Sequence, residues 1–203
     1  FRVHETGNVL AKGYVTASIN YRLASNQINF VAFQEEQYLT VLKSVADLKS
    51  AIRYFRKDYV NNDSYGIDPN TIFIGGSSAG AVTAIHSCYI DTISDLPTTS
   101  TPNGTNIQTL VTNMGGLEGD AGNYGYSSEV SGVISFSGGI NNLNWIDTND
   151  EPLVSCQGNA DQTIDYNCGP GLGFSTVLTL CGSNEMHIQA ENESLLNDKL
   201  MFQ

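Results

Sequence analysis

The stretch IFIGGSSAGAVTA (72–84) decides the fold, because it passes from strand-forming residues through a glycine- and serine-rich turn into helix-forming residues. Its centre, GSSAG (76–80), fits the pattern G-x-S-x-G, in which a serine sits on a sharp, strained turn between a strand and a helix. The flanking glycines allow the strand and the helix to approach closely. We predict that Ser78 is a nucleophile and that the N–H of Ala79, at the helix start, stabilises an oxyanion.

Two phosphate-binding loops share this glycine-rich character, and neither fits. A dinucleotide-binding loop requires G-x-G-x-x-G, and residues 75–80 lack the second glycine of that pattern. A P-loop requires Gly-Lys followed by Ser or Thr, and no lysine lies nearby. A strand–helix turn without any chemistry remains the alternative to a nucleophilic Ser78.

A nucleophilic serine needs a base, and the base needs a carboxylate that orients it. In this architecture the chain order is serine, acid, histidine. The predicted strand EPLVSCQG (151–158) ends three residues before Asp161, and catalytic groups of open α/β sheets gather at such strand ends. We predict Asp161 as the acid. Asp165, further along the loop, is the rival, and an ordinary turn role stays open for both.

None of the three histidines is a clear base. His4 precedes the first recognisable strand, and His86 lies two helical turns beyond the candidate nucleophile, so it points away. His187 has the right order but falls early in a predicted helix. The expected place is a loop after the next strand, which begins at the final residues KLMFQ. We therefore expect the catalytic histidine beyond Gln203, with His187 as a weaker alternative.

The alternation of strands and helices predicts an α/β fold with a mainly parallel sheet and helices on both faces, incomplete at both termini. The expected strands are 12–23 (mostly buried), 71–76, 130–138, 151–158 and 199 onward; the expected helices are one containing 38–55, one at 79–90 and one at about 185–198. The first helix has one apolar face, and its basic residues fall largely off that stripe: Lys43, Lys49, Arg53 and Arg56.

The segment 91–129 is different, since it is rich in Thr, Ser, Pro, Asn and Gly and has only weak periodicity. A long irregular segment inside a compact domain is typically functional or mobile. It is a candidate lid or pocket-lining insertion, and a surface loop without a role is the alternative. Residues 1–203 show no linker or internal repeat, so we expect a single domain.

Composition argues against several classes of partner. The net charge is −12 with only nine Lys and Arg, which argues against nucleic acid. No apolar run approaches the roughly 18 residues of a membrane span. The opening FRVHETGNVL lacks a signal-peptide pattern and an initiator Met, so we expect the chain to be an internal part of a longer protein. The oligomeric state has no readable signal.

The four cysteines form no C-x-x-C pair, which argues against a zinc or redox motif. Cys88 and Cys156 fall in apolar segments and are expected in the core. Cys168 and Cys181 flank a Gly-rich loop, and the sequence leaves open whether they form a disulfide. Sparse lysine and the prospect of this disulfide favour an extracellular or periplasmic location.

Four segments together resemble the carboxylesterase and lipase branch of the α/β-hydrolases, bacterial esterases and lipases most closely: GYVTASINYRLA, SVADLKSAIRYFRKD, YGIDPNTIFIGGSSAGAVTA and EPLVSCQGNADQTIDY. The resemblance covers most of the chain and implies Ser78 as nucleophile, Asp161 as acid and the Ala79 N–H as one oxyanion donor. It also implies an ion pair between Arg22 and Asp47 that ties the core helix to the sheet. In this family a His-Gly-Gly oxyanion loop precedes the first of these segments and the catalytic His follows the last strand, so we expect both outside this chain.

The favoured function is a serine hydrolase that cleaves small-molecule carboxylic esters through an acyl-enzyme on Ser78, with no metal or cofactor. Two alternatives stay open: a non-catalytic α/β-hydrolase-like binding module, and a related serine peptidase or thioesterase. Without the histidine and the upstream oxyanion loop, residues 1–203 alone are expected to be nearly inactive. Which ester is cleaved is not readable from the sequence.

Overall fold

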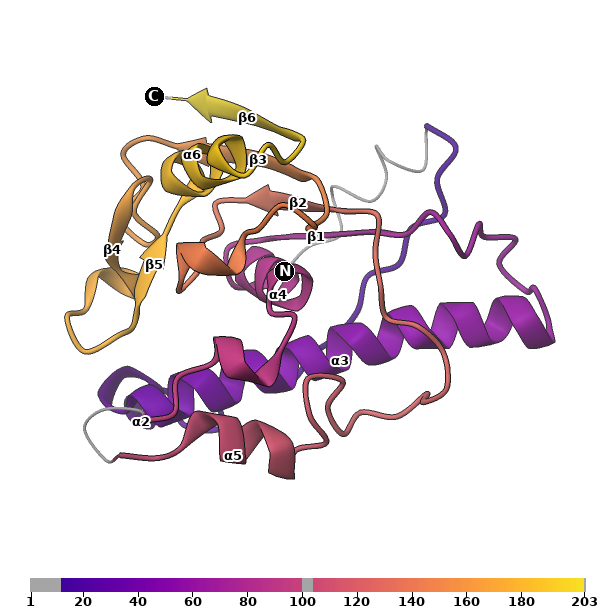
Figure 1. The fold of residues 1–203 in the computed structure, drawn as a ribbon, viewed down its shortest axis with the longest axis horizontal. Helices are drawn as coiled ribbons and strands as arrows, with labels where there is room; N and C mark the ends of the chain where they lie inside the picture. Colours follow the sequence, from indigo (N-terminus) through magenta and orange to yellow (C-terminus); the bar gives the residue numbers. More distant parts are fainter. Residues whose placement is uncertain (1–11, 100–103, 203) are drawn as a thin grey trace.

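A four-stranded parallel sheet forms the centre of the computed structural model, which describes residues 12–99 and 104–202 (Figure 1). The strands lie in the order β1-β2-β3-β6, and all neighbours are parallel: β1 Phe73–Ser77, β2 Gly132–Phe136, β3 Leu153–Gly158 and β6 Asn197–Phe202. β4 (Cys168–Pro170) and β5 (Thr179–Cys181) form a separate antiparallel pair. The predicted α/β class with a mainly parallel sheet packed against helices is confirmed.

Helices of two kinds accompany these strands. The α-helices of the described residues are α2 Gln27–Ala32, α3 Gln34–Asn61, α4 Ala79–Tyr89, α5 Ile107–Asn113 and α6 Ser183–Asn192, and the short 3-10 helices are η1 Ile93–Asp95, η2 Leu143–Trp145 and η3 Gly171–Gly173. In Figure 1, α3 runs along most of the long axis of the molecule, with α4 between it and the sheet and α5 on its other side. The sheet, α4 and α3 thus form successive layers.

The core lies between one face of the sheet and the helices. Alternation along the strands directs Ile74, Val133 and Leu153 to this face, where they are buried in one cluster with side chains of α4 and α6. On the opposite face, Ile134 and Val154 are 37% and 47% exposed. α4 contacts β1 and β2, and α6 contacts β3 and β6. The sequence also predicted helices on this opposite face. None of the helices formed by the described residues packs there.

The segment 12–23, predicted as a mostly buried strand, forms no strand and is mostly exposed. That prediction is wrong because an extended chain becomes a strand only when a neighbour shares its hydrogen bonds; in the described sheet, β1 lies at one edge and pairs only with β2. The segment is attached instead through Arg22, whose Nε donates to both carboxylate oxygens of Asp47 at 3.0 Å. The predicted Arg22–Asp47 ion pair is therefore confirmed, and Asp120 joins it at 2.8 Å.

Two helices differ from the predictions in extent. The helix expected over about 185–198 is α6, which ends earlier because Ser194, with φ 61°, turns the chain toward β6. Inside the segment 91–129, expected to be irregular, α5 forms a short helix. Ile107 and Val111 lie one turn apart on α5, and both are buried in the core. Three apolar residues, Ile107, Leu110 and Val111, in a polar segment were too weak a periodic signal to predict it.

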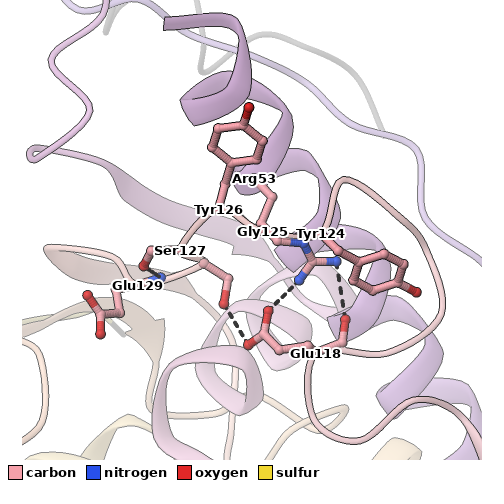
Figure 2. A pocket seen from close by; sticks show the side chains of 8 residues that line it. Arg53, Glu118, Tyr124, Gly125, Tyr126, Ser127 and Glu129 are labelled. Carbon is pink, nitrogen blue, oxygen red and sulfur yellow. Dashed lines mark hydrogen bonds and ion pairs between the residues drawn. The ribbon is translucent and has the colours of Figure 1, made fainter. Parts of the chain in front are cut away.

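The long predicted helix is present as α3, but its basic residues are not all outside the core. Arg53 is only 1% exposed and Lys49 only 9%, contrary to the prediction that both lie largely off the buried stripe. The reason is that the chain after α5 lies along α3 and supplies Glu118 (Figure 2). The Glu118 carboxylate pairs with the Arg53 guanidinium and, at 3.3 Å, with the Lys49 ammonium. Arg53 also donates to the carbonyl of Gly122 at 2.7 Å.

A hollow opens where this chain meets α3, lined by Arg53, Glu118 and residues 124–129 (Figure 2). Two of its charged groups, Arg53 and Glu118, are paired with each other, and the Ser128 hydroxyl also donates to Glu118 at 2.7 Å. The ring of Tyr124 covers the Arg53 guanidinium, with 5.4 Å between the guanidinium carbon and the ring centroid. These contacts fasten the chain to α3. Whether the segment as a whole acts as a lid stays a prediction.

Replacement of Glu118 by Ala removes the carboxylate that neutralises the buried Arg53 guanidinium. Because Glu118 is itself 47% exposed, we expect the free energy of unfolding to fall by about 2 kcal/mol, less than the full cost of breaking a buried pair. Glu129→Ala is the matched control, since Glu129 lines the same hollow without an ion pair in the described structure, and it should cost under about 0.5 kcal/mol. Urea unfolding measures both; equal losses would contradict the importance of the ion pair.

Candidate active site at the carboxyl edge of the sheet

Ser78 occupies the turn between β1 and α4, with φ 52° and ψ −120°. Residues other than glycine rarely adopt this left-handed region, and doing so costs of order 1–3 kcal/mol. The turn is held by the Ser78 N–H, which donates to the carbonyl of Phe136 on β2 at 2.8 Å. The Ser78 side chain makes no capping hydrogen bond to α4. The strained strand–helix turn expected at this position is therefore present, and its hydroxyl is not committed to the helix end.

The close approach of strand and helix at this turn depends on Gly76. A Cβ at Gly76 would lie 2.4 Å from the carbonyl carbon of Gly80 and 2.6 Å from its oxygen, so the two backbones touch directly. At Gly80 itself a Cβ would meet only the Tyr21 hydroxyl, at the ordinary contact distance of 3.8 Å. Of the two glycines in the G-x-S-x-G pattern, packing therefore requires only the first.

β1, β2 and β3 end at the same edge of the sheet. N–H groups just beyond each strand continue the hydrogen bonding to the neighbouring strand. The Ser78 N–H bonds to β2, the Ser137 N–H donates to the Cys156 carbonyl on β3 at 2.9 Å, and the Asn159 N–H donates to the Phe202 carbonyl on β6 at 3.0 Å. Neighbouring strands are about 4.8 Å apart. Ser78 and the loop after β3 thus leave the same edge about 10 Å apart, with β2 between them.

Asp161 lies in the loop after β3, and main-chain N–H groups hold its carboxylate. Oδ1 accepts from the N–H of Thr163 at 2.9 Å and from the N–H of Ile164 at 3.2 Å. Oδ2 has only a long contact, 3.5 Å from Nε2 of Gln157, among the described residues. Asp161 is partly buried, whereas the rival Asp165 is exposed. The second oxygen of Asp161 therefore remains able to accept a further N–H, which is what orienting an imidazole requires.

His86 is packed inside the protein. Its Nδ1 donates to the carbonyl of Val82 at 2.8 Å, and its Nε2 accepts from the N–H of Asn141 at 3.4 Å. Its ring meets the ring of Trp145 edge-on. Burial lowers the pKa of His86 to about 4, so the imidazole is neutral. The expectation that His86 points away from Ser78 agrees with these contacts.

His187 is also buried, and both of its nitrogens are engaged. Nε2 lies 2.7 Å from the hydroxyl of Ser155 on β3, and Nδ1 lies 2.6 Å from the side-chain oxygen of Asn197 on β6. Burial lowers the pKa of His187. No described hydrogen bond joins either imidazole to Ser78, and His4 lies outside the described residues.

Sequence reasoning did not single out the polar side chains on the buried face of β3. Ser155 and Gln157 are 2% and 0% exposed. In EPLVSCQG, these two residues alternate with residues that point to the other face of the sheet. Polar residues at the inward positions of a predicted buried strand are the sequence signal that could have identified them. Gln157 also contacts the loop that carries Asp161. It therefore belongs in the description of this edge of the sheet.

Cys168 and Cys181, left open by the sequence, form a disulfide across β4 and β5. β5 is anchored beside the end of β2, because Cys181 and Ile140 exchange two backbone hydrogen bonds of 2.8 and 2.9 Å. Cys88 and Cys156 are free thiols.

Within residues 12–99 and 104–202, no group of three His, Cys, Asp or Glu is arranged to hold a metal ion. No helix of these residues is long and apolar enough to cross a bilayer.

Comparison with known proteins gives a family match and several solved folds. The BD-FAE family model matches residues 2–141. A truncated form of a carbohydrate esterase from gut microbiota is 19% identical with a TM-score of 0.55, covering 78% of this chain and 59% of its own length. Esterase 2 of Thermogutta terrifontis, phosphoramylated by tabun, is 18% identical with a TM-score of 0.52, covering 80% and 53%.

A lipase/esterase from Lactobacillus plantarum is 12% identical with a TM-score of 0.58, covering 99% of this chain and 71% of its own length. At these identities the solved structures establish the fold alone. The chain spans 59% and 53% of the length of the first two structures. No curated protein gives a significant match.

Gly76→Ala tests the backbone contact that shapes the turn at Ser78. The added methyl meets backbone atoms that cannot move aside, so we expect the free energy of unfolding to fall by about 3 kcal/mol. Gly80→Ala is the control, because its methyl has room and alanine favours the first turn of α4 by up to about 1 kcal/mol. Urea unfolding of both variants decides the matter. Equal effects would show that the two backbones do not touch.

Proposed function

Since this chain belongs to the BD-FAE family, a family of carbohydrate esterases with the α/β-hydrolase fold, we propose that it carries the nucleophile and the acid of a serine esterase. The observation that carries the proposal is Ser78, held at φ 52° on the turn between β1 and α4 with its hydroxyl uncommitted to the helix end. Asp161 supports it from the same edge of the sheet, two strands away. The proposed substrate is a carboxylic ester whose alcohol part is a sugar.

In the proposed reaction the Ser78 Oγ attacks the ester carbonyl carbon while a histidine takes the hydroxyl proton. The negative charge that develops on the carbonyl oxygen is stabilised by the Ala79 N–H at the start of α4. Collapse of this intermediate expels the alcohol, which receives the proton from the histidine, and leaves the acyl group on Ser78. Water, deprotonated by the same histidine, then attacks the acyl carbonyl carbon. The acid leaves, and the histidine returns the proton to the Ser78 Oγ. Asp161 keeps the imidazole in the required tautomer throughout.

The proposal takes this histidine from beyond Gln203, as expected from the sequence. Support comes from the two described imidazoles, because each already has both nitrogens bonded. His86 is held by Val82 and Asn141 inside the core, and His187 is held between β3 and β6. Moving either one to Ser78 would leave its buried partners unpaired, which costs about 1–3 kcal/mol for each group.

The relatives support an acyl-transfer reaction of this kind. Among the solved structures with a similar fold, Thermogutta terrifontis esterase 2 occurs phosphorylated by paraoxon and, separately, with propionate bound. The gut relative is described as a carbohydrate esterase. Activated phosphoesters react with activated nucleophiles, so the same reagent is a direct probe for Ser78.

Ser78→Ala in the full-length protein of this reading frame should reduce p-nitrophenyl acetate hydrolysis by at least about 10³-fold, because the acyl-enzyme can no longer form. Ser77→Ala, one residue earlier at the end of β1, should keep the activity. Mass spectrometry should find a diethylphosphoryl group on Ser78 after treatment with paraoxon. Equal hydrolysis by the Ser78→Ala variant would sink the assignment and favour a binding module or another nucleophile.

Residues 1–203 alone should hydrolyse the same ester at least about 10³-fold more slowly than the full-length protein, because neither described imidazole is free to act as base. The comparison uses equal molar concentrations and confirms folding by circular dichroism. His187→Asn in the full-length protein should retain activity. Robust turnover by residues 1–203, abolished by His187→Asn, would show that His187 is the base after all.

A further inference from the structure

We propose that Gln157 is a positioning residue for Asp161, acting through the main chain of the acid loop, residues 159–167. Gln157 ends the buried face of β3 and is 0% exposed. The proposal rests on the proposed function, in which Asp161 orients the catalytic histidine. It adds a residue that determines where the carboxylate lies.

The Gln157 amide is held in one orientation by backbone groups on both sides. Its Oε1 accepts from the N–H of Ser183, the first residue of α6, at 2.7 Å. Its Nε2 donates to the carbonyl of Ile164 in the acid loop at 2.8 Å. Because one partner is a donor and the other an acceptor, a flipped amide would lose both bonds. Gln157 therefore joins α6 to the acid loop across the end of β3.

Ile164 transmits this contact to the carboxylate. Its carbonyl accepts from Gln157, and its N–H donates to Asp161 Oδ1 at 3.2 Å, beside the Thr163 N–H at 2.9 Å. The second Nε2 hydrogen of Gln157 faces Asp161 Oδ2 at 3.5 Å. Gln157 thus fixes both the turn that binds one carboxylate oxygen and the direction of the other. In the proposed mechanism, the group that donates to Oδ2 at an ordinary hydrogen-bond distance is the catalytic imidazole.

The far side of the acid loop is docked on the same helix start. The Gly182 N–H donates to the Asn167 carbonyl at 2.6 Å, and the Asn184 N–H donates to the Tyr166 carbonyl at 2.9 Å. A Cβ at Gly182 would lie 2.1 Å from the loop backbone at Asp165. Two groups reach the Asp161 end of the loop. The Leu172 N–H donates to the Thr163 carbonyl at 2.8 Å, and the Gln157 side chain binds Ile164.

Ser155 provides a matched comparison. It lies two residues earlier on the same face of β3, is 2% exposed, and bonds to His187 of the same helix α6. It makes no contact with the acid loop that the described structure records. Loss of either side chain removes a buried hydrogen bond between β3 and α6, but only loss of Gln157 releases Asp161.

The test measures kcat, KM and melting temperature in the full-length protein for Gln157→Met and Ser155→Ala. We expect Gln157→Met to lower kcat by about 10- to 100-fold with KM within about twofold, as a misplaced catalytic group does. Ser155→Ala should lower the melting temperature and leave kcat unchanged. Should Gln157→Met fail to fold, Gln157→Glu keeps the acceptor for Ser183 but sets a carboxylate oxygen against Asp161 Oδ2 and the Ile164 carbonyl in place of the donor, and it should lower kcat at least as much.

A double-mutant comparison separates positioning from general destabilisation. In an Asp161→Ala background, adding Gln157→Met should change kcat/KM no further, because the group that Gln157 positions is already gone. Faster amide hydrogen exchange at Thr163 and Ile164 in Gln157→Met, but not in Ser155→Ala, would show the loosened turn directly.

The outcomes separate this inference from the proposed function. A large loss in Asp161→Ala together with a Gln157→Met variant that behaves like Ser155→Ala overturns the inference and leaves the function intact. Equal losses from Gln157→Met in both backgrounds also overturn it. Full activity in Asp161→Ala overturns the acid assignment and the inference with it.

Discussion

The structure depends on the direct contact between the main chains of β1 and α4 at Gly76 and Gly80, which no side chain separates. This contact draws α4 onto the sheet, so that its small residues Ala81 and Ala84 are fully buried. The same closeness extends to the end of β2, where a Cβ at Gly138 would lie 2.6 Å from the Cβ of Ala81. A chain that passes so directly from strand to helix must turn within one residue, and the left-handed backbone of the candidate nucleophile is the consequence.

Features set by neighbours in the sequence could be predicted. β1, β2, β3 and β6 follow from short apolar runs, and α3 and α4 from helical periodicity and small residues. The turn at Ser78 and the location of Asp161 after β3 follow because the pattern and the order of elements specify them. The ion pair of Arg22 with Asp47 is implied by the family resemblance, and its geometry confirms it. The catalytic roles and the extracellular or periplasmic location stay predictions.

Features set by distant partners could not be predicted. Arg53 is buried because Glu118, 65 residues later, returns along α3 to neutralise it, and a charge on a helix gives no sign of such a partner. Segment 12–23 has the composition of a strand, but composition does not supply the neighbour that a strand needs. The role of Gln157 is hidden for the same reason, since its amide meets Ser183 26 residues further on. In each case the sequence contains the group, and only the fold shows what it contacts.

β3 lies in the interior of the sheet, yet its buried face carries Ser155 and Gln157 where apolar residues would suit a strand better. A buried polar group left unpaired costs about 1–3 kcal/mol, so such residues persist only where partners are fixed. Here the partners are His187 and Ser183 of α6 and Ile164 of the acid loop. A shift of β3 by one residue would turn this face away from α6 and unpair all of these groups at once. The polar face of β3 therefore contributes less to stability than an apolar face would. It fixes α6 and the acid loop in one position relative to the end of the strand.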